Sequence, residues 1–373
     1  MKVIKRRYTF FIFILIFLLT FIYLNKNLFF SNNLKNKLDD ISSSFGKEKN
    51  DFFDFDNIIP QNFTTFENDL AAVGSSEFIV FSQNFKKKLS VKHDFKHPIL
   101  KCSRYKSLVF DTSGNKYMIT SKSKVLSDGS VDKKIITGEI SELDNFVLVT
   151  ESDKYCCEMK VIDIKGNDKF QYFFANMYII DVSINNDGDK IAICGMKSEE
   201  GVIKSVVQIF DIKSEFPIFT KELDDTFISI NFFDNKNISL VGNHSTICIK
   251  NLGQKIKEFK YPKKQMCLFS FNKDFGTAIS FSPSNDYRNQ CILILNKNCQ
   301  QTSKIETGKK LKSIFFKNKS LTILSENQVQ VLDINGNNKL RSKSSTQCKS
   351  AIFLPNTKSI ALASSNKITK NND

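Results

Sequence analysis

The sequence predicts an all-β fold, a β-propeller of seven blades that follows a single N-terminal transmembrane helix. Two observations support the propeller: short alternating apolar runs repeat along the chain, and the repeats lie 38 to 46 residues apart. A third observation, an uncharged apolar segment directly after a basic N-terminus, predicts the membrane span. The chain has 373 residues, 41% of them hydrophobic, which is enough to bury a large core and excludes a disordered chain.

The N-terminus has the pattern of a membrane anchor. Residues 1–7 carry four positive charges and no negative one, and the seventeen residues 8–24 are uncharged. At about 1.5 Å per residue these cover roughly 25 Å of a hydrocarbon core of about 30 Å, and residues up to 30 can complete the span. The positive-inside rule places the N-terminus in the cytoplasm. A cleaved signal peptide begins in the same way, but the small residues that cleavage requires are missing, which favours an uncleaved anchor.

These patterns divide the chain into five parts. We predict a cytoplasmic basic tail, a transmembrane anchor, a linker or stalk, a propeller domain and a disordered tail, with the boundaries 1–7, 8–30, 31–68, 69–368 and 369–373. Acidic and aromatic residues alternate in the segment 51–56, which could dock onto the following domain. A flexible tether is the favoured interpretation of the whole linker.

The clearest copy of the repeat covers residues 179–194 and 205–211. Asn186-Asp-Gly188 lies between two runs of alternating apolar residues, and this is the short-range signature of a β-hairpin. The apolar residue before each such turn marks one repeat, and the seven anchors are Leu100, Ile140, Ile184, Ile230, Phe269, Ile314 and Ile352. Their spacing is the length of one four-stranded propeller blade.

The number of blades depends on how the ring closes. The last repeat, residues 348–368, is too short for a blade, so we expect it to pair with strands at 69–73 and 77–81. This gives seven blades, with six or eight left open. Long stretches of helical periodicity are missing after the anchor, which disfavours α/β folds, and about 300 residues exceed the usual size of a β-sandwich.

Four segments, together with the basic, Phe-rich anchor, resemble a known family. They are Leu108–Tyr117, Phe146–Glu151, Tyr178–Ile184 and Val207–Asp211. The chain resembles an uncharacterised family of membrane-anchored β-propellers of low-GC Gram-positive bacteria, a domain of unknown function. The resemblance covers nearly the whole chain and implies the fold, but it implies no functional residues. The chain has no Trp and so lacks the aromatic docking motif of quinoprotein propellers, and we expect no cofactor.

Histidine and cysteine offer little evidence of a metal site. The three histidines are His93, His97 and His244, and the first two have a metal-binding i, i+4 spacing only if they lie on a helix. The Pro98 that follows indicates a loop or strand end instead. The nine cysteines form no C-x-x-C pair, and several lie in apolar runs typical of buried free thiols. A pair formed by Cys291 and Cys299 across adjacent strands has weak support.

Catalytic motifs are also missing, and we predict no catalytic, cofactor-binding or metal-binding residues. Four aspartates occupy the same place in their repeats, after a strand and before a turn: Asp111, Asp163, Asp211 and Asp333. A ring of ligands is one interpretation of this repetition. The favoured one is structural, because Asp readily accepts backbone N–H bonds at a hairpin turn.

The net charge of +15 includes +4 before the predicted span and leaves +11 beyond it. Lysines cluster at 86–88, 263–264 and 309–312. A basic ectodomain attracts polyanions, here wall or membrane polymers, but solvated loop charges are the favoured interpretation. Aromatic residues do not accompany the lysines in a nucleic-acid-binding motif, so we predict no nucleic-acid partner.

Two classes of function are compatible with these observations. The favoured one is a membrane-anchored extracytoplasmic propeller that acts as a non-catalytic interaction or scaffolding module at the cell envelope. The alternative is an envelope enzyme, for example a glycan-active one, with its site at the central channel. We therefore predict a single-pass cell-membrane protein that is not an enzyme and whose C-terminal domain is extracytoplasmic. Its expected partners are the membrane, through the helix, and an envelope protein or an anionic wall polymer.

Overall fold

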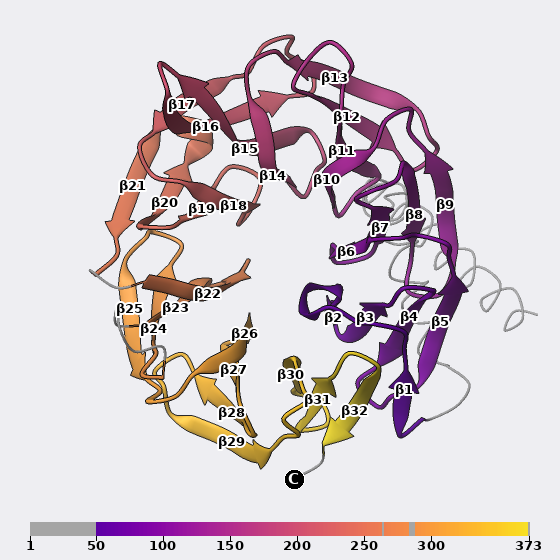
Figure 1. Ribbon diagram of the computed structural model, residues 1–373, viewed down its shortest axis with the longest axis vertical. Helices are drawn as coiled ribbons and strands as arrows, with labels where there is room; N and C mark the ends of the chain where they lie inside the picture. The colour runs from indigo at the N-terminus through magenta and orange to yellow at the C-terminus, as the bar shows by residue number, and fades with distance from the viewer. Residues whose placement is uncertain (1–49, 263–264, 283–287, 372–373) are drawn as a thin grey trace, which may run out of the picture. The chain divides into compact units, whose positions relative to one another are not determined.

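The computed structural model describes residues 50–262, 265–282 and 288–371, which form eight four-stranded antiparallel sheets in a ring (Figure 1). We call these sheets blades A to H. Blades A to D contain β2 (Phe63–Phe66), β3 (Asp69–Val73), β4 (Glu77–Ser82) and β5 (Lys87–Lys92); β6 (Pro98–Cys102), β7 (Ser107–Asp111), β8 (Lys116–Thr120) and β9 (Val125–Ser130); β10 (Ile135–Ile140), β11 (Asn145–Thr150), β12 (Cys157–Asp163) and β13 (Asp168–Phe174); β14 (Tyr178–Ile184), β15 (Lys190–Glu199), β16 (Val202–Asp211) and β17 (Phe219–Leu223).

Blades E to H continue this order around the ring. They contain β18 (Phe227–Phe232), β19 (Ile238–Gly242), β20 (Ser245–Lys250) and β21 (Lys255–Lys260); β22 (Gln265–Asn272), β23 (Gly276–Ser282), β24 (Cys291–Asn296) and β25 (Gln301–Glu306); β26 (Leu311–Lys317), β27 (Ser320–Ser325), β28 (Gln328–Asp333) and β29 (Asn338–Lys343); β30 (Ser350–Leu354), β31 (Ser359–Ala363), β32 (Lys367–Asn371) and β1 (Phe52–Asp54). Two three-residue 3-10 turns, η1 (Pro60–Asn62) and η2 (Asn251–Gly253), complete the described elements.

The hydrophobic core lies between neighbouring blades. The second strand of a blade is buried on both faces, as in β19 and β31, where every residue is buried, because each sheet is covered by a blade on either side. The outermost strands β5 and β21 instead alternate between exposed and half-buried residues. One apolar cluster joins Val161 and Phe174 of blade C to Ile191 and Phe210 of blade D. The alternating apolar pattern of the sequence thus builds a core between the sheets.

The two ends of the chain meet in blade H. Strand β1 pairs with β32, with Phe53 opposite Ile368, and Figure 1 shows the indigo β1 beside the yellow β32. The buried ring of Phe53 packs on Phe81 and Phe85, with centroids 4.5 and 5.7 Å away. A strand from one end of the chain therefore completes a sheet with three strands from the other end, which closes the ring.

The all-β propeller is observed, but the prediction of seven blades is wrong because the ring has eight. The seven anchors found in the sequence mark blades B to H, and residues 63–92 form a complete blade A of their own. The last repeat is completed by β1 and not by the strands at 69–73 and 77–81. Strand β1 has three residues, too few to give a clear alternation, and it lies in the interval interpreted as a linker. Strand β32 likewise extends to Asn371, into the predicted tail.

The predicted membrane location requires a correction. The predicted anchor, residues 8–30, and the basic tail, residues 1–7, lie outside the described residues. Within the described part of the chain, no helix is long and apolar enough to cross a membrane, which takes about 20 apolar residues. The fold therefore gives no support for a single-pass membrane protein with an extracytoplasmic domain, and that prediction is not carried further.

Candidate functional site

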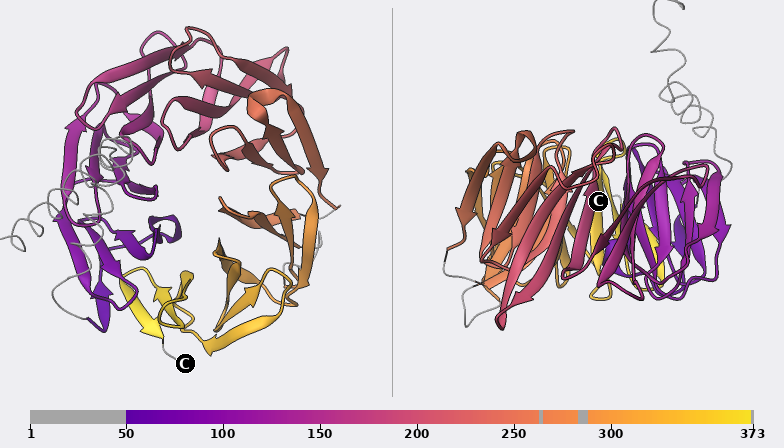
Figure 2. Two further views of the ribbon diagram at one scale, coloured as in Figure 1. Left: turned by 180° about the vertical axis from the view of Figure 1, so that it is seen from behind. Right: turned by 90° about the horizontal axis from the view of Figure 1, so that it is seen from above.

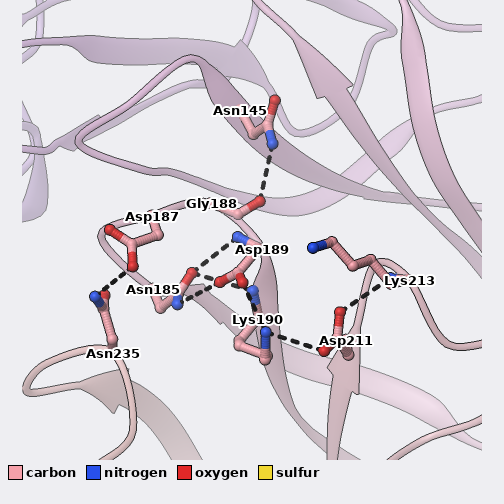
Figure 3. Close-up of polar contacts among 9 residues, drawn as sticks. All are labelled: Asn145, Asn185, Asp187, Gly188, Asp189, Lys190, Asp211, Lys213 and Asn235. Carbon is pink, nitrogen blue, oxygen red and sulfur yellow. Dashed lines mark hydrogen bonds and ion pairs between the residues drawn. The ribbon is translucent and has the colours of Figure 1, made fainter. Parts of the chain in front are cut away.

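One end of the ring is formed by the turns that join the innermost strand of each blade to its second strand. We call this end the turn face, and the strands of every blade run between it and the opposite face (Figure 2). The turn between β14 and β15 shows how these turns are built (Figure 3). The side-chain oxygen of Asn185 accepts hydrogen bonds from the backbone N–H groups of Asp189 and Lys190, at 3.0 and 3.1 Å. The sequence prediction of a hairpin here is confirmed.

Gly188 is the residue in this turn that cannot carry a side chain. Its φ is +73°, and a Cβ atom at this position would lie 3.0 Å from both the Cβ of Asn145 and the Oγ of Ser141. The carbonyl oxygen of Gly188 accepts a hydrogen bond of 2.9 Å from the Asn145 amide of blade C (Figure 3). The glycine therefore permits both the turn and the close approach of the neighbouring blade.

Side chains on the turn face join most neighbouring blades. The contacts are Arg104 with Glu67 at 3.3 Å between blades A and B, Lys106 with Asp144 at 3.3 Å between B and C, Asn145 with Gly188 between C and D, Asn235 with Asp187 at 2.5 Å between D and E, and Gln83 with Asn356 at 2.9 Å between A and H. Polar contacts thus link the turns of blades H, A, B, C, D and E along one side of the ring.

Lys273 makes a different contact, because it reaches across the ring. It follows β22 of blade F, and its ammonium group lies 2.5 Å from the carboxylate of Glu142 on blade C and also donates to the side-chain oxygen of Asn186 on blade D. Side chains of blades C, D and F therefore meet at one cation on the turn face, although blade F is not a neighbour of the other two.

Below these groups lies a polar chamber of about 680 Å³, lined by residues of blades A to G. Its charged lining consists of Glu67, Arg104, Glu139, Glu142, Lys273, Asp274 and Lys317. Arg104 pairs with Glu67 and Lys273 with Glu142, so that four of these charges are engaged with one another.

A further ion pair involves Glu139 of the chamber lining. The ammonium group of Lys101 is 3.5 Å from the Glu139 carboxylate, and Asp181 of the next innermost strand lies nearby and accepts a hydrogen bond of 3.0 Å from the backbone of Ile230. Burial raises the pKa of Glu139 and Asp181 acts in the same direction, while Lys101 opposes both. Burial lowers the pKa of Lys101, but the two carboxylates outweigh it and the net shift is upward. Lys101 and the two carboxylates therefore stabilise each other's charges, whereas Asp181 and Glu139 repel each other.

The opposite face carries the longest hairpin of the described blades. Strands β15 and β16 each have ten residues, and β14 pairs with β15 only as far as Met196. Strand β17 pairs with β16 from Ser205 onward, so that residues 197–204 pair only with each other. We call this two-stranded extension the hairpin arm. Its turn is formed by Glu200 and Gly201, both with positive φ, as two-residue hairpin turns favour.

The hairpin arm exposes apolar side chains. Val202 and Ile203 are 57% and 65% exposed, and Tyr178 at the base of the arm is 63% exposed. On the same face of blade C, the rings of Tyr155 and Phe173 lie 5.0 Å apart and are also exposed. Exposed aliphatic and aromatic side chains on the same face of neighbouring blades are typical of an interaction surface.

Lysine and glutamate neutralise each other at the base of the arm. Lys197 pairs with Glu199 at 3.3 Å and also contacts the Glu222 carboxylate, and Lys204 lies 3.5 Å from Glu222. The repeat found in the sequence covers residues 179–194 and 205–211 and leaves out the segment 195–204. Glu200-Gly201, followed by Val202 and Ile203, is the signal from which the arm could have been found.

The structure places the candidate histidines on separate elements or in loops. His93 and His97 lie in the loop between β5 and β6, as predicted, and the ring of His93 stacks on Phe95. Burial lowers the pKa of His93. His244 lies on blade E, where its Nδ1 is 2.9 Å from the Asp225 carboxylate. Within the described ranges, three metal-ligating side chains do not come together at any point.

The four repeated aspartates accept backbone hydrogen bonds, which confirms the structural interpretation. Asp111 accepts from His97 N–H at 2.9 Å, and Asp163, Asp211 and Asp333 each accept from the residue two positions later at 2.8 to 3.0 Å. Burial acts to raise the pKa of Asp163, but hydrogen bonds from Asn167 and an ion pair with Lys169 outweigh it and hold that pKa well below its usual range.

Several of the clustered lysines have protein partners. Lys88 pairs with Asp69 at 2.8 Å, Lys309 donates to Gln328 at 2.6 Å, and Lys312 donates to the Thr346 carbonyl at 2.6 Å. Lys263 and Lys264 lie outside the described residues.

The nine cysteines are free thiols, six of them buried. Cys291 does not face Cys299, because its strand pairs it with Glu306.

The described residues therefore form an eight-bladed β-propeller with a polar central chamber and one protruding hairpin arm. The chain belongs to a family of unknown function, DUF5711, whose model matches residues 48–371. The match covers the propeller, which agrees with the resemblance to an uncharacterised family. It does not bear on the membrane anchor or the bacterial group that the resemblance implied.

Solved structures show the same fold at low sequence identity. BamB from Moraxella catarrhalis is 12% identical with a TM-score of 0.52, and the similarity covers 87% of this chain and 98% of that one. Sqt1 from Saccharomyces cerevisiae is 11% identical with a TM-score of 0.60, covering 88% and 100%. AztD from Citrobacter koseri, in its apo form, is 8% identical with a TM-score of 0.51, covering 78% and 86%. No curated protein sequence matches the chain.

Proposed function

We propose that this protein is a non-catalytic binding module whose hairpin arm takes an extended segment of a partner protein by strand addition. The observation that carries the proposal is the arm itself, residues 197–204, in which two strands pair with each other and neither outer edge pairs with another strand of blade D. Free N–H and C=O groups on such an edge can pair with an added strand. Natural proteins usually cover unpaired strand edges. The exposed edges of the hairpin arm are therefore candidates for binding another strand.

The side chains on the arm favour an apolar partner segment. Val202 and Ile203 are exposed side by side in sequence and so point to opposite faces of the arm. The charges of Lys197 and Lys204 are already balanced by Glu199 and Glu222. The arm therefore presents little net charge, and the partner segment it suits is an extended one with apolar residues at alternate positions. An anionic polymer, the other partner class that the sequence suggests, is less well matched to it.

The absence of catalysis is part of the proposal. In the chamber, Arg104 and Lys273 are engaged with Glu67 and Glu142, and the Lys101–Glu139 pair is held by its own charges. An enzyme at the channel, the alternative, would need a base or nucleophile free to react there. The paired charges of the chamber suit a structural role better.

The proposal can be tested by selecting displayed random peptides on the full-length protein. We expect peptides with alternating apolar residues, bound at least about tenfold more weakly by Ile203→Asp. Binding should slow amide hydrogen exchange at residues 197–204. Val125→Asp, on the exposed outer strand of blade B, is the matched control and should bind normally. Acidic or phosphorylated ligands bound equally by wild type and Ile203→Asp, or protection confined to the turn face, would contradict the proposal.

A further inference from the structure

Two buried cysteines from neighbouring blades are in contact. Cys248 lies in β20 of blade E, and Cys299 lies in the turn between β24 and β25 of blade F, 51 residues further along the chain. Their sulfur atoms are 2.7 Å apart, and the residues are 1% and 6% exposed. This distance is shorter than an ordinary van der Waals contact between sulfur atoms. The fold therefore places two thiols against each other across the boundary between two blades.

The surroundings keep this pair in place. Phe233, Phe259 and Phe271 pack around the two cysteines, and they come from both blades. The Cys299 thiol also lies 3.4 Å from the carbonyl oxygen of Thr246. Its backbone N–H donates to Asn296 at 3.0 Å, and its φ is +56°, so the turn fixes the direction of the side chain. Among the other cysteines, the thiols of Cys194 and Cys157 donate to backbone carbonyl oxygens instead of to a second thiol.

The electrostatic environment makes Cys248 the thiol of the pair that loses its proton more readily. The hydrogen bond from the Cys299 thiol lowers the pKa of Cys248. Burial opposes this shift, while the ammonium groups of Lys250 and Lys257 support it. The thiolate is the reactive form of cysteine in oxidation. Cys248 is therefore the attacking member of the pair and Cys299 the resolving one.

We propose that Cys248 and Cys299 are an oxidative modification site, at which a small peroxide converts the two thiols into a disulfide that joins blades E and F. The Cys248 thiolate attacks one peroxide oxygen, the O–O bond breaks, and a sulfenic acid and hydroxide form. The sulfur of Cys299 then attacks the sulfenic sulfur, and the S–S bond forms as the hydroxyl group leaves as water. In total the two thiols lose two electrons and two protons, and hydrogen peroxide becomes two molecules of water.

The burial of the pair determines which oxidant fits. A protein disulfide cannot reach sulfur atoms that are this well covered without opening the blades, whereas hydrogen peroxide is little larger than water. The product would close a covalent loop of the intervening residues and connect two blades that are otherwise joined by one chain segment and by non-covalent contacts. The chain-entropy model predicts that such a cross-link stabilises the folded ring.

The test treats the folded full-length protein with hydrogen peroxide, alkylates the remaining thiols in denaturant, and maps the peptides by mass spectrometry without reduction. We expect one cross-linked peptide pair, containing Cys248 and Cys299, and a loss of two hydrogen atoms from the intact mass. Cys248→Ser and Cys299→Ser should abolish it, whereas Cys194→Ala, at another buried cysteine, should keep it. Full alkylation of both thiols after peroxide treatment, or cross-links spread over several cysteines, would overturn the proposal.

Thermal unfolding gives a second measurement. Oxidised wild type should unfold at a temperature roughly 5 °C higher than the reduced protein, and added reductant should reverse the shift. Cys194→Ala should show the same shift, and the two serine variants should show none. If a serine variant does not fold, Cys248→Ala and Cys299→Ala take its place, and the peptide map of the wild type still decides. A cross-link formed without any rise in unfolding temperature would contradict the stabilising effect.

Discussion

The ammonium group of Lys273 on blade F lies 2.5 Å from the carboxylate of Glu142 on blade C, although the two residues are 131 positions apart in the chain. Two other blades separate them along the ring. An ion pair between distant blades can resist distortion of the ring in a way that contacts between neighbouring blades cannot. Since both side chains are partly exposed, water and salt screen the pair.

A double-mutant cycle with Lys273→Met and Glu142→Gln measures this pair. We expect a coupling free energy of about 0.5–1 kcal/mol that falls as salt is added, because the pair is only partly shielded. The same cycle on Lys304 and Glu306, which are both more than half exposed and lie on one strand, is the control and should give a smaller value. Urea unfolding of the four proteins supplies the data. Equal coupling free energies in both cycles would show that the ion pair across the ring stabilises the fold no more than an ordinary surface pair.

Two glycines with similar backbone conformations should respond differently to alanine. Gly188 and Gly201 both have positive φ, +73° and +79°, but only at Gly188 would a Cβ meet Asn145 and Ser141 at 3.0 Å. Gly201→Ala should cost about 1 kcal/mol of unfolding free energy, for the backbone alone. Gly188→Ala adds the displacement of blade C and should cost about 3 kcal/mol. Denaturant unfolding measures the unfolding free energy of both variants. Equal losses would mean that Asn145 and Ser141 of blade C move aside at no cost.

Much of the fold could be predicted from local patterns. The turn at Asn186-Asp-Gly188 and the turn aspartates were recognised because their interactions lie within a few residues of each other in the chain. The alternation of apolar residues identified seven of the eight blades. Local sequence also identified the strands at 69–73 and 77–81, but not that they belong to a separate blade A.

The strand pairing and the cysteine contact that the sequence did not predict join residues far apart in the chain. Strand β1 is identified only by its pairing with β32, more than 300 residues later, and Phe53 is buried by Phe81 and Phe85 of another blade. The contact of Cys248 with Cys299 likewise has no local signal, since blade spacing varies and the register between neighbouring blades is set by packing. A single sequence does not reveal such pairings.

Asp163 should make stability depend on pH in the acid range. Its folded-state pKa is held below that of the unfolded chain, about 3.9, so its contribution is fully present above that pH. The contribution is lost as pH falls toward the folded-state pKa, because the unfolded chain then binds the proton more readily. Asp163→Asn should therefore lower the melting temperature at pH 7 by more than at pH 3. Asp54→Asn, at an exposed position in β1, is the control and should change the melting temperature by the same amount at pH 7 and at pH 3. If Asp163→Asn lowers the melting temperature equally at both pH values, the folded-state pKa of Asp163 is not lowered.

Lys106 and Asp144 show how a buried ion pair responds to the loss of either partner. The Lys106 side chain is 2% exposed, its ammonium group lies 3.3 Å from the Asp144 carboxylate, and it also donates to the Glu142 carbonyl at 3.3 Å. Burial lowers the pKa of Lys106, although Asp144 opposes the shift. The charged form of the lysine is thus already unfavourable in its site and depends on these partners.

Asp144→Asn should therefore cost about 1–3 kcal/mol, because it leaves an ammonium group buried without its counter-charge. Lys106→Met should be nearly neutral, since the methionine fills most of the same volume and the partly exposed Asp144 carboxylate remains hydrated. The double variant should be close to Lys106→Met alone, because the buried charge is then gone. Unfolding in urea at pH 7 measures all three. If Lys106→Met is as destabilising as Asp144→Asn, the lysine contributes through its hydrogen bonds to the turn of blade C, and the cost of burying its charge is smaller than the structure indicates.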